Sequence, residues 1–228
     1  MPDLPKIFPL GLGALTVDFG TEISISLNDK AISLASHFDE NRFPGFVEAV
    51  PAYSSVAIFY DVVETRRRSP QFDTAFEVVS YLVHSALQKD LDTVKHDARL
   101  IEVPVDFSDA AALDIDFVIR HSGLSREEVI EIFTSKTYRV YMLGFLPGFA
   151  YMGDVDERIS VPRKDSPRVK VPKGSVGIAG RQTGVYPLES PGGWQIVGRT
   201  NVDMFTPTTD ALCLLKAGDE VRFVPIAR

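Results

Sequence analysis

Three neighbouring stretches dominate the second half of this sequence: GFLPGFAYMG at residues 144–153, VPRKDSPRVKVPKGSVGIAGRQTGVYP at 161–187 and SPGGWQIVGRT at 190–200. Proline breaks the hydrogen-bond ladder of a helix and glycine adds an entropic cost, so these stretches exclude a helix. They are too rich in Val, Ile, Phe, Tyr and Trp to be disordered. We therefore predict short strands joined by tight turns, and turns of this kind commonly carry binding sites.

The composition of the whole chain is typical of a soluble globular protein. Its 228 residues are 45% hydrophobic and 24% charged, enough for one large domain or two smaller ones. No apolar run is long enough to cross a bilayer and the N-terminus lacks a signal-peptide pattern, so we expect a cytoplasmic protein. The single cysteine, Cys213, excludes an internal disulfide, and the run ALCLL around it predicts a buried strand residue. The net charge of −7 argues against nucleic acid as the main partner.

Positive charge is concentrated between residues 157 and 200. Eight basic residues stand there against only three acidic ones, although the chain as a whole is acidic. Arginine side chains and glycine-rich turns both suit a phosphate or carboxylate ligand. The same pattern is equally typical of a strand face whose charges point into solvent, so both interpretations stay open at this point.

The first part of the chain predicts a small α+β domain. Apolar alternation and helical spacing indicate a strand, a helix, two strands and a helix, at residues 15–19, 23–38, 46–50, 56–60 and 69–87. We expect the last helix to begin at Ser69–Pro70, a capping hydroxyl followed by proline in the first turn. This order of elements is typical of a split β-α-β unit. The polar residues 88–99 then predict a linker.

The second part begins with an expected strand at residues 100–105 and two expected helices at 110–121 and 126–136. Ser125 and Glu128 form a capping box at the start of the second helix. From there to the end the pattern predicts only strands and turns. We therefore place two domains, at residues 1–92 and 93–228.

Several common catalytic motifs are absent from the sequence. It has no P-loop, no dinucleotide-binding glycine pattern and no G-x-S-x-G nucleophile turn. None of the four histidines falls in the glycine-rich region, and no Cys/His cluster has the spacing of metal ligands. We therefore expect no metal site, and any chemistry in that region has to use Lys, Arg, Tyr, Ser, Thr, Asp or Glu.

In its three glycine-rich stretches the chain resembles a known family. The three glycine-rich stretches, in this order and at this close spacing, are similar to signature blocks of the 5-oxoprolinase B-subunit family, also labelled KipI or allophanate hydrolase subunit 1. A weaker resemblance extends over PLGLGALTVDFG, AVPAYSSVAIFYD and AGDEVRFVPI. The family is related to the carboxyltransferase domain of urea carboxylase. The resemblance implies an α+β chain with an N-terminal ferredoxin-like domain and a C-terminal cyclophilin-like β-barrel.

The resemblance also implies an activity. Members pair with C-type (KipA-like) and A-type (LamB/YcsF-like) partner proteins and open the lactam of 5-oxoproline to glutamate, using ATP with magnesium. The chain is then one subunit of a cytoplasmic hydrolase and is inactive alone. Two alternatives stay open: a KipI-like inhibitor that binds a sensor histidine kinase, and half of a biotin-dependent carboxyltransferase of the urea carboxylase or allophanate hydrolase type.

Candidate site residues follow from the resemblance and from the chemistry it implies. Phosphorylating a lactam oxygen requires cations around the phosphate oxygens more than it requires a strong nucleophile. The expected catalytic residues are Lys173, Arg168 and Tyr186. The residues expected to bind substrate or anion are Arg163, Ser175, Gln182, Thr183 and Arg199. The residues expected to line the pocket are Phe145, Pro147, Gly148, Phe149, Tyr151 and Trp194, although Phe145, Phe149 and Trp194 suit a barrel core equally well.

Two positions depart from the family pattern. Residues 106–114 read DFSDAAALD where many members have a glycine-rich segment, and Phe133 stands where many have a histidine. Phe133 lies four residues after Val129 on the predicted helix, so we expect it to pack in the core. These departures keep another substrate and a purely regulatory role open.

Overall fold

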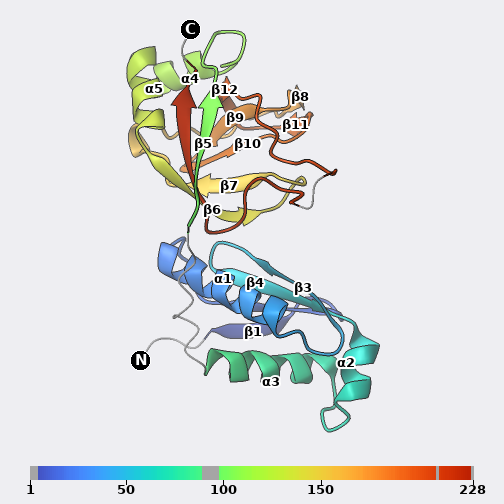
Figure 1. Ribbon diagram of the computed structural model, residues 1–228. Coiled ribbons are helices and arrows are strands. Elements are labelled where there is room, and N and C mark those ends of the chain that lie inside the picture. Colours follow the sequence, from blue (N-terminus) through green and yellow to red (C-terminus); the bar gives the residue numbers. More distant parts are fainter. Residues whose placement is uncertain (1–4, 89–97, 209–210, 227–228) are drawn as a thin grey trace. The chain divides into compact units, whose positions relative to one another are not determined.

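The computed structural model describes residues 5–88, 98–208 and 211–226, and its chain separates into two compact units, residues 1–97 and 98–228 (Figure 1). Most of the predicted linker, residues 89–97, lies outside the described residues. Each unit mixes helices and strands around a core of its own, so the predicted α+β class is confirmed.

Unit 1 is a four-stranded antiparallel sheet with helices packed on it. Its described elements are β1 (Lys6–Pro9), β2 (Ala14–Asp18), α1 (Ile25–Glu40), β3 (Phe46–Pro51), β4 (Ser55–Tyr60), α2 (Val62–Arg68) and α3 (Ala75–Leu87). The strand order is β1-β2-β4-β3, so β4 lies between the two strands that α1 connects. The outer strand beside β2 is β1, which comes from the start of the chain.

The core of unit 1 follows from strand alternation and helix periodicity. Leu15, Val17, Val56 and Ile58 are fully buried at alternate positions of neighbouring strands, as the period of two in a strand requires. The helices α1 and α3 bury Leu34, Phe38, Val79 and Val83 in the same cluster. This cluster defines the covered face of the sheet.

The expected helix beginning at Ser69–Pro70 is wrong in position. A helix that the sequence reading missed, α2, begins after the cap Asp61 and ends with Ser69 as its C-terminal cap. The next helix, α3, begins only at Ala75, because Thr74 and Glu77 form a complete capping box there. The serine and proline therefore lie in the turn between two helices.

Unit 2 contains most of the strands. Its described elements are β5 (Leu100–Val105), α4 (Ile115–Ser122), α5 (Arg126–Thr134), β6 (Thr137–Leu143), β7 (Ala150–Gly153), the 3₁₀ helix η2 (Glu157–Ile159), β8 (Arg168–Val171), β9 (Ser175–Ala179), β10 (Gln182–Val185), β11 (Ser190–Gly192), β12 (Gln195–Arg199) and β13 (Glu220–Pro225). Seven strands form one sheet in the order β12-β9-β10-β7-β6-β13-β5. The pair β8–β11 forms a small separate sheet beside it (Figure 1).

The seven-stranded sheet curls into a nearly closed barrel. Asp106, directly after β5, and Arg199, in β12, exchange two main-chain hydrogen bonds of 2.7 and 2.9 Å, which join the two edge strands. Gly198 allows this approach, because a Cβ there would lie 2.5 Å from Val105 Cγ1. An edge that is closed in this way no longer offers free hydrogen-bonding groups at that point.

Phe133 lies in the barrel core, as predicted. Its ring stacks on Phe223 with centroids 5.0 Å apart and lies 5.3 Å from the ring of Tyr138. The hydroxyl of Tyr138 donates to the Phe133 carbonyl at 2.7 Å, so the one polar side-chain atom of these three aromatic residues has a hydrogen-bond partner.

Two further expectations differ from the structure. The helix expected at residues 110–121 begins only at Ile115, because Asp114 turns inward and its carboxylate accepts the main-chain N–H of Ile196 at 2.8 Å. Cys213 is half-buried and forms an isolated bridge with Phe205, so it is not a buried strand residue. In the described part of the chain, no helix has both the length and the apolarity needed to cross a bilayer.

Candidate functional site

An aromatic cluster of Phe149, Tyr186 and Trp194 is separate from the barrel core. The Phe149 ring lies edge-on to Tyr186 and to Trp194, with centroids 5.3 and 5.4 Å apart. Gly184 of β10 makes room for it, because a Cβ there would come within 3.3 Å of both Phe149 and Trp194 ring atoms. All three rings are buried, and Tyr151 packs against them, so they form a small apolar core of their own.

Phe145 lies at the exposed rim of this aromatic cluster. Its side chain is 59% exposed, and its ring is edge-on to Phe149 and Tyr186 at 5.5 and 6.5 Å. Its φ of +70° is the only positive value of a non-glycine residue among the described residues, and such a conformation costs about 1–3 kcal/mol. The core interpretation of Phe145 is therefore wrong, whereas Phe149 and Trp194 are buried.

The loop that carries Phe145 is tightly held. The main chain of Gly144 and Phe149 is hydrogen-bonded across the loop at 3.1 Å. Gly148 has φ of +81°, and a Cβ there would lie 2.8 Å from the Met204 carbonyl oxygen. Pro147 is exposed between them. The Gly-Phe-Leu-Pro-Gly stretch thus presents one aromatic ring from a rigid turn.

Arg163 is the cation beside the aromatic cluster. Its guanidinium lies 5.9 Å from the centroid of the Trp194 ring, a cation–π contact. Within residues 5–88, 98–208 and 211–226 no carboxylate pairs with it. An exposed arginine held in this way is available to an anionic group of a ligand.

Tyr186 provides a neutral phenol beneath the rim. Burial raises the pKa of Tyr186 above its ordinary value, although a hydrogen bond with the Trp194 main chain and the charge of Arg163 act in the opposite direction. The phenol therefore stays protonated at neutral pH and keeps a hydrogen to donate.

Arg168 is bound to a carboxylate that the sequence reading did not single out. It donates to both oxygens of Asp114 at 2.6 and 2.7 Å, and Lys164 donates to the same carboxylate at 3.1 Å. Burial alone raises the pKa of Asp114, but the hydrogen bonds from Arg168, the Ile196 N–H and Lys164 outweigh it and lower the pKa below its ordinary value. Arg168 thus fixes β8 on the barrel and acts on Tyr186 only through its charge.

Lys173 and Arg199 form a second cationic group. The Lys173 ammonium pairs with Asp203 at 2.6 Å, and Arg199 Nε donates to the Lys173 carbonyl at 3.2 Å. The next residues of this turn, Gly174 and Ser175, exchange main-chain hydrogen bonds of 2.8 and 2.9 Å with Tyr186. Ser175 itself is buried. Main-chain hydrogen bonds therefore connect the turn that carries Lys173 to Tyr186.

Gln182 and Thr183 lie at the other end of β10 from Tyr186. Gln182 is paired with Gly153 and Ala179 in the sheet. Thr183 is fully buried, and its hydroxyl donates to the Gly177 carbonyl at 2.9 Å. The Thr183 side chain is therefore directed to the Gly177 carbonyl and not to the aromatic rim.

Most of the basic residues between positions 157 and 200 are already paired. Ion pairs join six of the eight to carboxylates: Arg158, Lys164, Arg168, Lys170, Lys173 and Arg181. Among these eight basic residues, only Arg163 and Arg199 therefore lack a carboxylate partner in the described residues. Nor do the described residues include a group of three His, Cys, Asp or Glu side chains able to hold a metal ion.

Comparison with known proteins identifies the family. The family model described as "Carboxyltransferase domain, subdomain C and D" matches residues 5–215. The chain belongs to this carboxyltransferase-domain family. The carboxyltransferase-domain chain is 43% identical to the 5-oxoprolinase B subunit of Bacillus subtilis (strain 168) over 97% of its own length and 93% of the relative's. It is 35% identical to the 5-oxoprolinase B subunit of Escherichia coli O157:H7 over 96% and 95% of the two chains.

A solved structure supports the same assignment. The crystal structure of TTHA0988 matches with a TM-score of 0.80 and 34% identity, over 94% of the carboxyltransferase-domain chain. The match spans only 40% of that longer chain. The carboxyltransferase-domain chain therefore spans less than half of the length of this solved relative.

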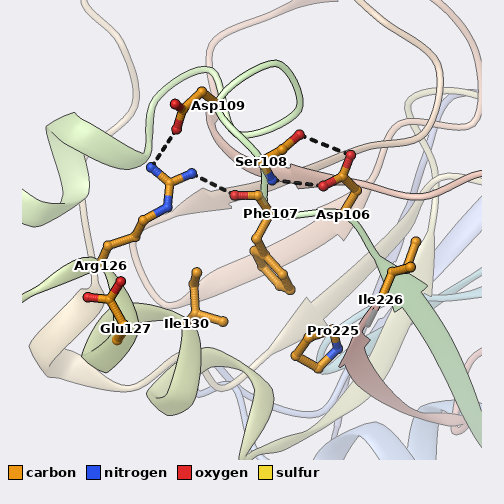
Figure 2. A pocket seen from close by; sticks show the side chains of 9 residues that line it. All are labelled: Asp106, Phe107, Ser108, Asp109, Arg126, Glu127, Ile130, Pro225 and Ile226. Atoms are coloured by element: carbon orange, nitrogen blue, oxygen red, sulfur yellow. Dashed lines mark hydrogen bonds and ion pairs between the residues drawn. The ribbon is translucent and has the colours of Figure 1, made fainter. Parts of the chain in front are cut away.

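The carboxyltransferase-domain chain also has a hollow, which shares no residue with the aromatic cluster. This α5 cleft, of about 350 Å³, is lined by Asp106, Phe107, Ser108, Asp109, Arg126, Glu127, Ile130, Pro225 and Ile226 (Figure 2). Sequence reading missed it, since three distant segments build it and none of them carries a recognisable binding motif. The only signal was that residues 106–114 depart from the glycine-rich pattern.

Proposed function

We propose that this chain is the B-type subunit of an ATP-dependent 5-oxoprolinase complex. The observation that carries the proposal is 43% identity to the 5-oxoprolinase B subunit of Bacillus subtilis, along nearly the full length of both chains. The complex is a hetero-oligomeric, cytoplasmic hydrolase that also contains C-type (KipA-like) and A-type (LamB/YcsF-like) proteins. It binds ATP with magnesium, and this chain is inactive alone.

The reaction consumes two water molecules: one is added across the lactam C–N bond of 5-oxoproline, giving glutamate, and the other is used as ATP is converted to ADP and phosphate. Arg163 is suited to hold the substrate carboxylate, because it is exposed and held against Trp194. The neutral Tyr186 phenol is suited to donate a hydrogen bond to the lactam oxygen. Phe145 and Phe149 exclude water from that side.

Lys173 and Arg199 are suited to contact phosphate oxygens, because their turn is hydrogen-bonded to the Tyr186 main chain. Lys173 has to leave Asp203 to do so, and half of each of these two side chains is exposed, so the pair is only weakly held. Arg168 positions this region through Asp114.

The finer fold assignment belongs to the same proposal. We infer that unit 1 is a ferredoxin-like domain, because β4 lies between β2 and β3, with β1 taking the outer position beside β2. We infer that unit 2 is a cyclophilin-like barrel, because its seven strands nearly close and its core lies inside them. The domains are then residues 1–92 and 93–228, with the boundary in the linker.

A coupled assay tests the proposal. The chain is co-expressed with C-type and A-type partners, and ATP-dependent release of glutamate from 5-oxoproline is followed for wild type, Arg163→Ala and Lys173→Ala. We expect each variant to lower the rate by about tenfold or more, as lost electrostatic contacts to a reacting group do. Lys170→Ala, which removes an exposed lysine paired with Glu189, is the matched control and keeps the wild-type rate. An assembled complex without activity rejects the proposal.

A carboxyltransferase role is the second candidate, and the description of the matching family model favours it. It requires transfer of a carboxyl group between biotin and an amide- or urea-like acceptor. Carboxyl transfer from a carboxybiotinylated carrier to urea, dependent on this chain, distinguishes it from 5-oxoproline hydrolysis.

A further inference from the structure

The α5 cleft is built from three segments of unit 2. One wall is the turn after β5, Asp106–Asp109, and the other comes from the start of α5 and the end of β13. Figure 2 shows Phe107 between the α5 residues and the end of β13. The barrel therefore places residues from three distant parts of the chain around one hollow of about 350 Å³.

The wall of the cleft is fixed before any ligand arrives. The main chain of Asp106 is bridged to Arg199, and its carboxylate accepts from the Ser108 N–H at 2.8 Å and the Ser108 hydroxyl at 3.0 Å. Arg126 donates to the Phe107 carbonyl at 2.6 Å. A binding surface that is already ordered loses little conformational entropy on association.

The lining combines an apolar surface with an excess of negative charge. Phe107, Ile130, Pro225 and Ile226 supply the apolar part, and Ile226 is 46% exposed. Asp106, Asp109 and Glu127 supply three carboxylates against the single cation Arg126. An aliphatic chain that ends in a cation matches both properties.

The positive charge of Arg126 does not cancel the preference of the cleft for a cationic ligand. Its guanidinium is engaged by the Phe107 carbonyl and by Asp109, at 2.6 and 2.9 Å, and its side chain is 26% exposed. The Asp109 side chain is 95% exposed, so one carboxylate oxygen can accept a hydrogen bond from a ligand while the other remains paired with Arg126. The cleft therefore offers acceptors to an incoming donor.

We propose that the α5 cleft receives a lysine or arginine side chain from a partner protein of the complex. The aliphatic stem lies against Phe107, Ile130 and Pro225, and the charged head lies between Asp109 and Glu127. The identity of the partner rests on the proposed function, because a B-type protein works within a complex. The preference for a basic side chain rests on the cleft alone.

The chemical preference is tested on the full, ¹⁵N-labelled chain by NMR titration. The probes are the N-acetyl methylamides of lysine, arginine, norleucine and glutamate. We expect the two basic probes to shift the amide signals of Ser108, Asp109, Glu127 and Ile130, and to bind about fivefold or more tightly than norleucine. Equal shifts with all four probes, or shifts elsewhere, overturn the proposal.

Variants then test the partner. Asp109→Asn combined with Glu127→Gln removes both outer charges, whereas Glu220→Lys changes an exposed charge at the opposite end of β13. With the C-type partner in calorimetric titrations, we expect the double variant to bind about fivefold or more weakly and Glu220→Lys to bind normally. Unchanged affinity of the double variant overturns the docking role and leaves the oxoprolinase proposal intact. Basic probes that bind a chain without affinity for the partner reject both the docking role and the oxoprolinase proposal.

Discussion

Arg168 donates to both carboxylate oxygens of Asp114, at 2.6 and 2.7 Å. Asp114 is 6% exposed, and its carboxylate also accepts from Lys164 and from the Ile196 N–H. One buried charge thereby ties the start of α4 to β12 and to the small β8–β11 sheet. The aromatic cluster depends on this arrangement, because Val171 of β8 and Ile196 of β12 belong to it.

Removing Asp114 should unfold unit 2 more readily. We expect Asp114→Ala to lower the free energy of unfolding by about 3–5 kcal/mol, because the half-buried Arg168 loses its compensating charge. Urea unfolding of the full chain measures the change. Glu189→Ala, which breaks the exposed pair with Lys170, is the control and should cost less than about 1 kcal/mol. Equal losses in the two variants would contradict a special role for Asp114.

Asp114 also predicts a pH dependence with a defined sign. Its folded-state pKa lies below the ordinary value of 3.8, so its stabilising contribution is present above pH 3.8 and is lost as the pH falls through the lower, folded-state pKa. We expect the wild type to lose stability in this acid range more steeply than Asp114→Asn. Urea midpoints measured along a pH series provide the test, and parallel curves would count against it.

The strained turn at Phe145 predicts a separation of stability from activity. We expect Phe145→Gly to change the free energy of unfolding by less than about 1 kcal/mol, because relief of the positive φ offsets the lost contacts of an exposed ring. The same variant should lower the activity of the assembled complex. Phe149→Ala is the comparison: its ring is buried, so truncation should cost about 3–5 kcal/mol. A large stability loss for Phe145→Gly would show that the ring is structural.

The closure of the barrel predicts a sensitive glycine. Gly198→Ala places a methyl group 2.5 Å from Val105 Cγ1 and 3.1 Å from the Asp106 carbonyl oxygen. We expect a loss of about 1–3 kcal/mol, because the strands have to separate. Gly193→Ala is the matched control, since its added methyl group meets no atom closer than 3.7 Å. Thermal unfolding of both variants decides the point, and similar melting temperatures would refute the close-approach argument.

The sequence predicted those elements whose signals are local. The capping box of Ser125 and Glu128 placed the start of α5 at Arg126, and alternation located β2 and β4. The sequence misplaced the start of α4, because that boundary depends on the hydrogen bond from the Ile196 N–H to the Asp114 carboxylate, and the two residues are 82 positions apart. Similarly, Ser69–Pro70 resembles a helix start, but the complete capping box at Thr74 competes with it and prevails.

The candidate site was only partly predictable for the same reason. The dense pattern of glycine and aromatic residues marked Phe149, Tyr186 and Trp194, which the structure brings together. Thr183 was not separable from a site residue by sequence alone, because its hydroxyl donates to the carbonyl of Gly177 on the neighbouring strand. The α5 cleft had no motif to mark it, because its chemistry arises where Asp109, Glu127 and Pro225 meet.

The position of β13 has a consequence for synthesis of the chain. β13 lies between β5 and β6, pairing in parallel with the first and antiparallel with the second, yet it is the last strand along the sequence. A ribosome therefore releases β5 long before residues 220–225, its ladder partner, emerge, and such non-local pairing is slow and exposed to aggregation. Unit 1, whose described strands and helices all precede residue 88, has every pairing partner available much earlier. Folding of the nascent chain should proceed in two stages, with the barrel completed only after residues 220–225 have been translated.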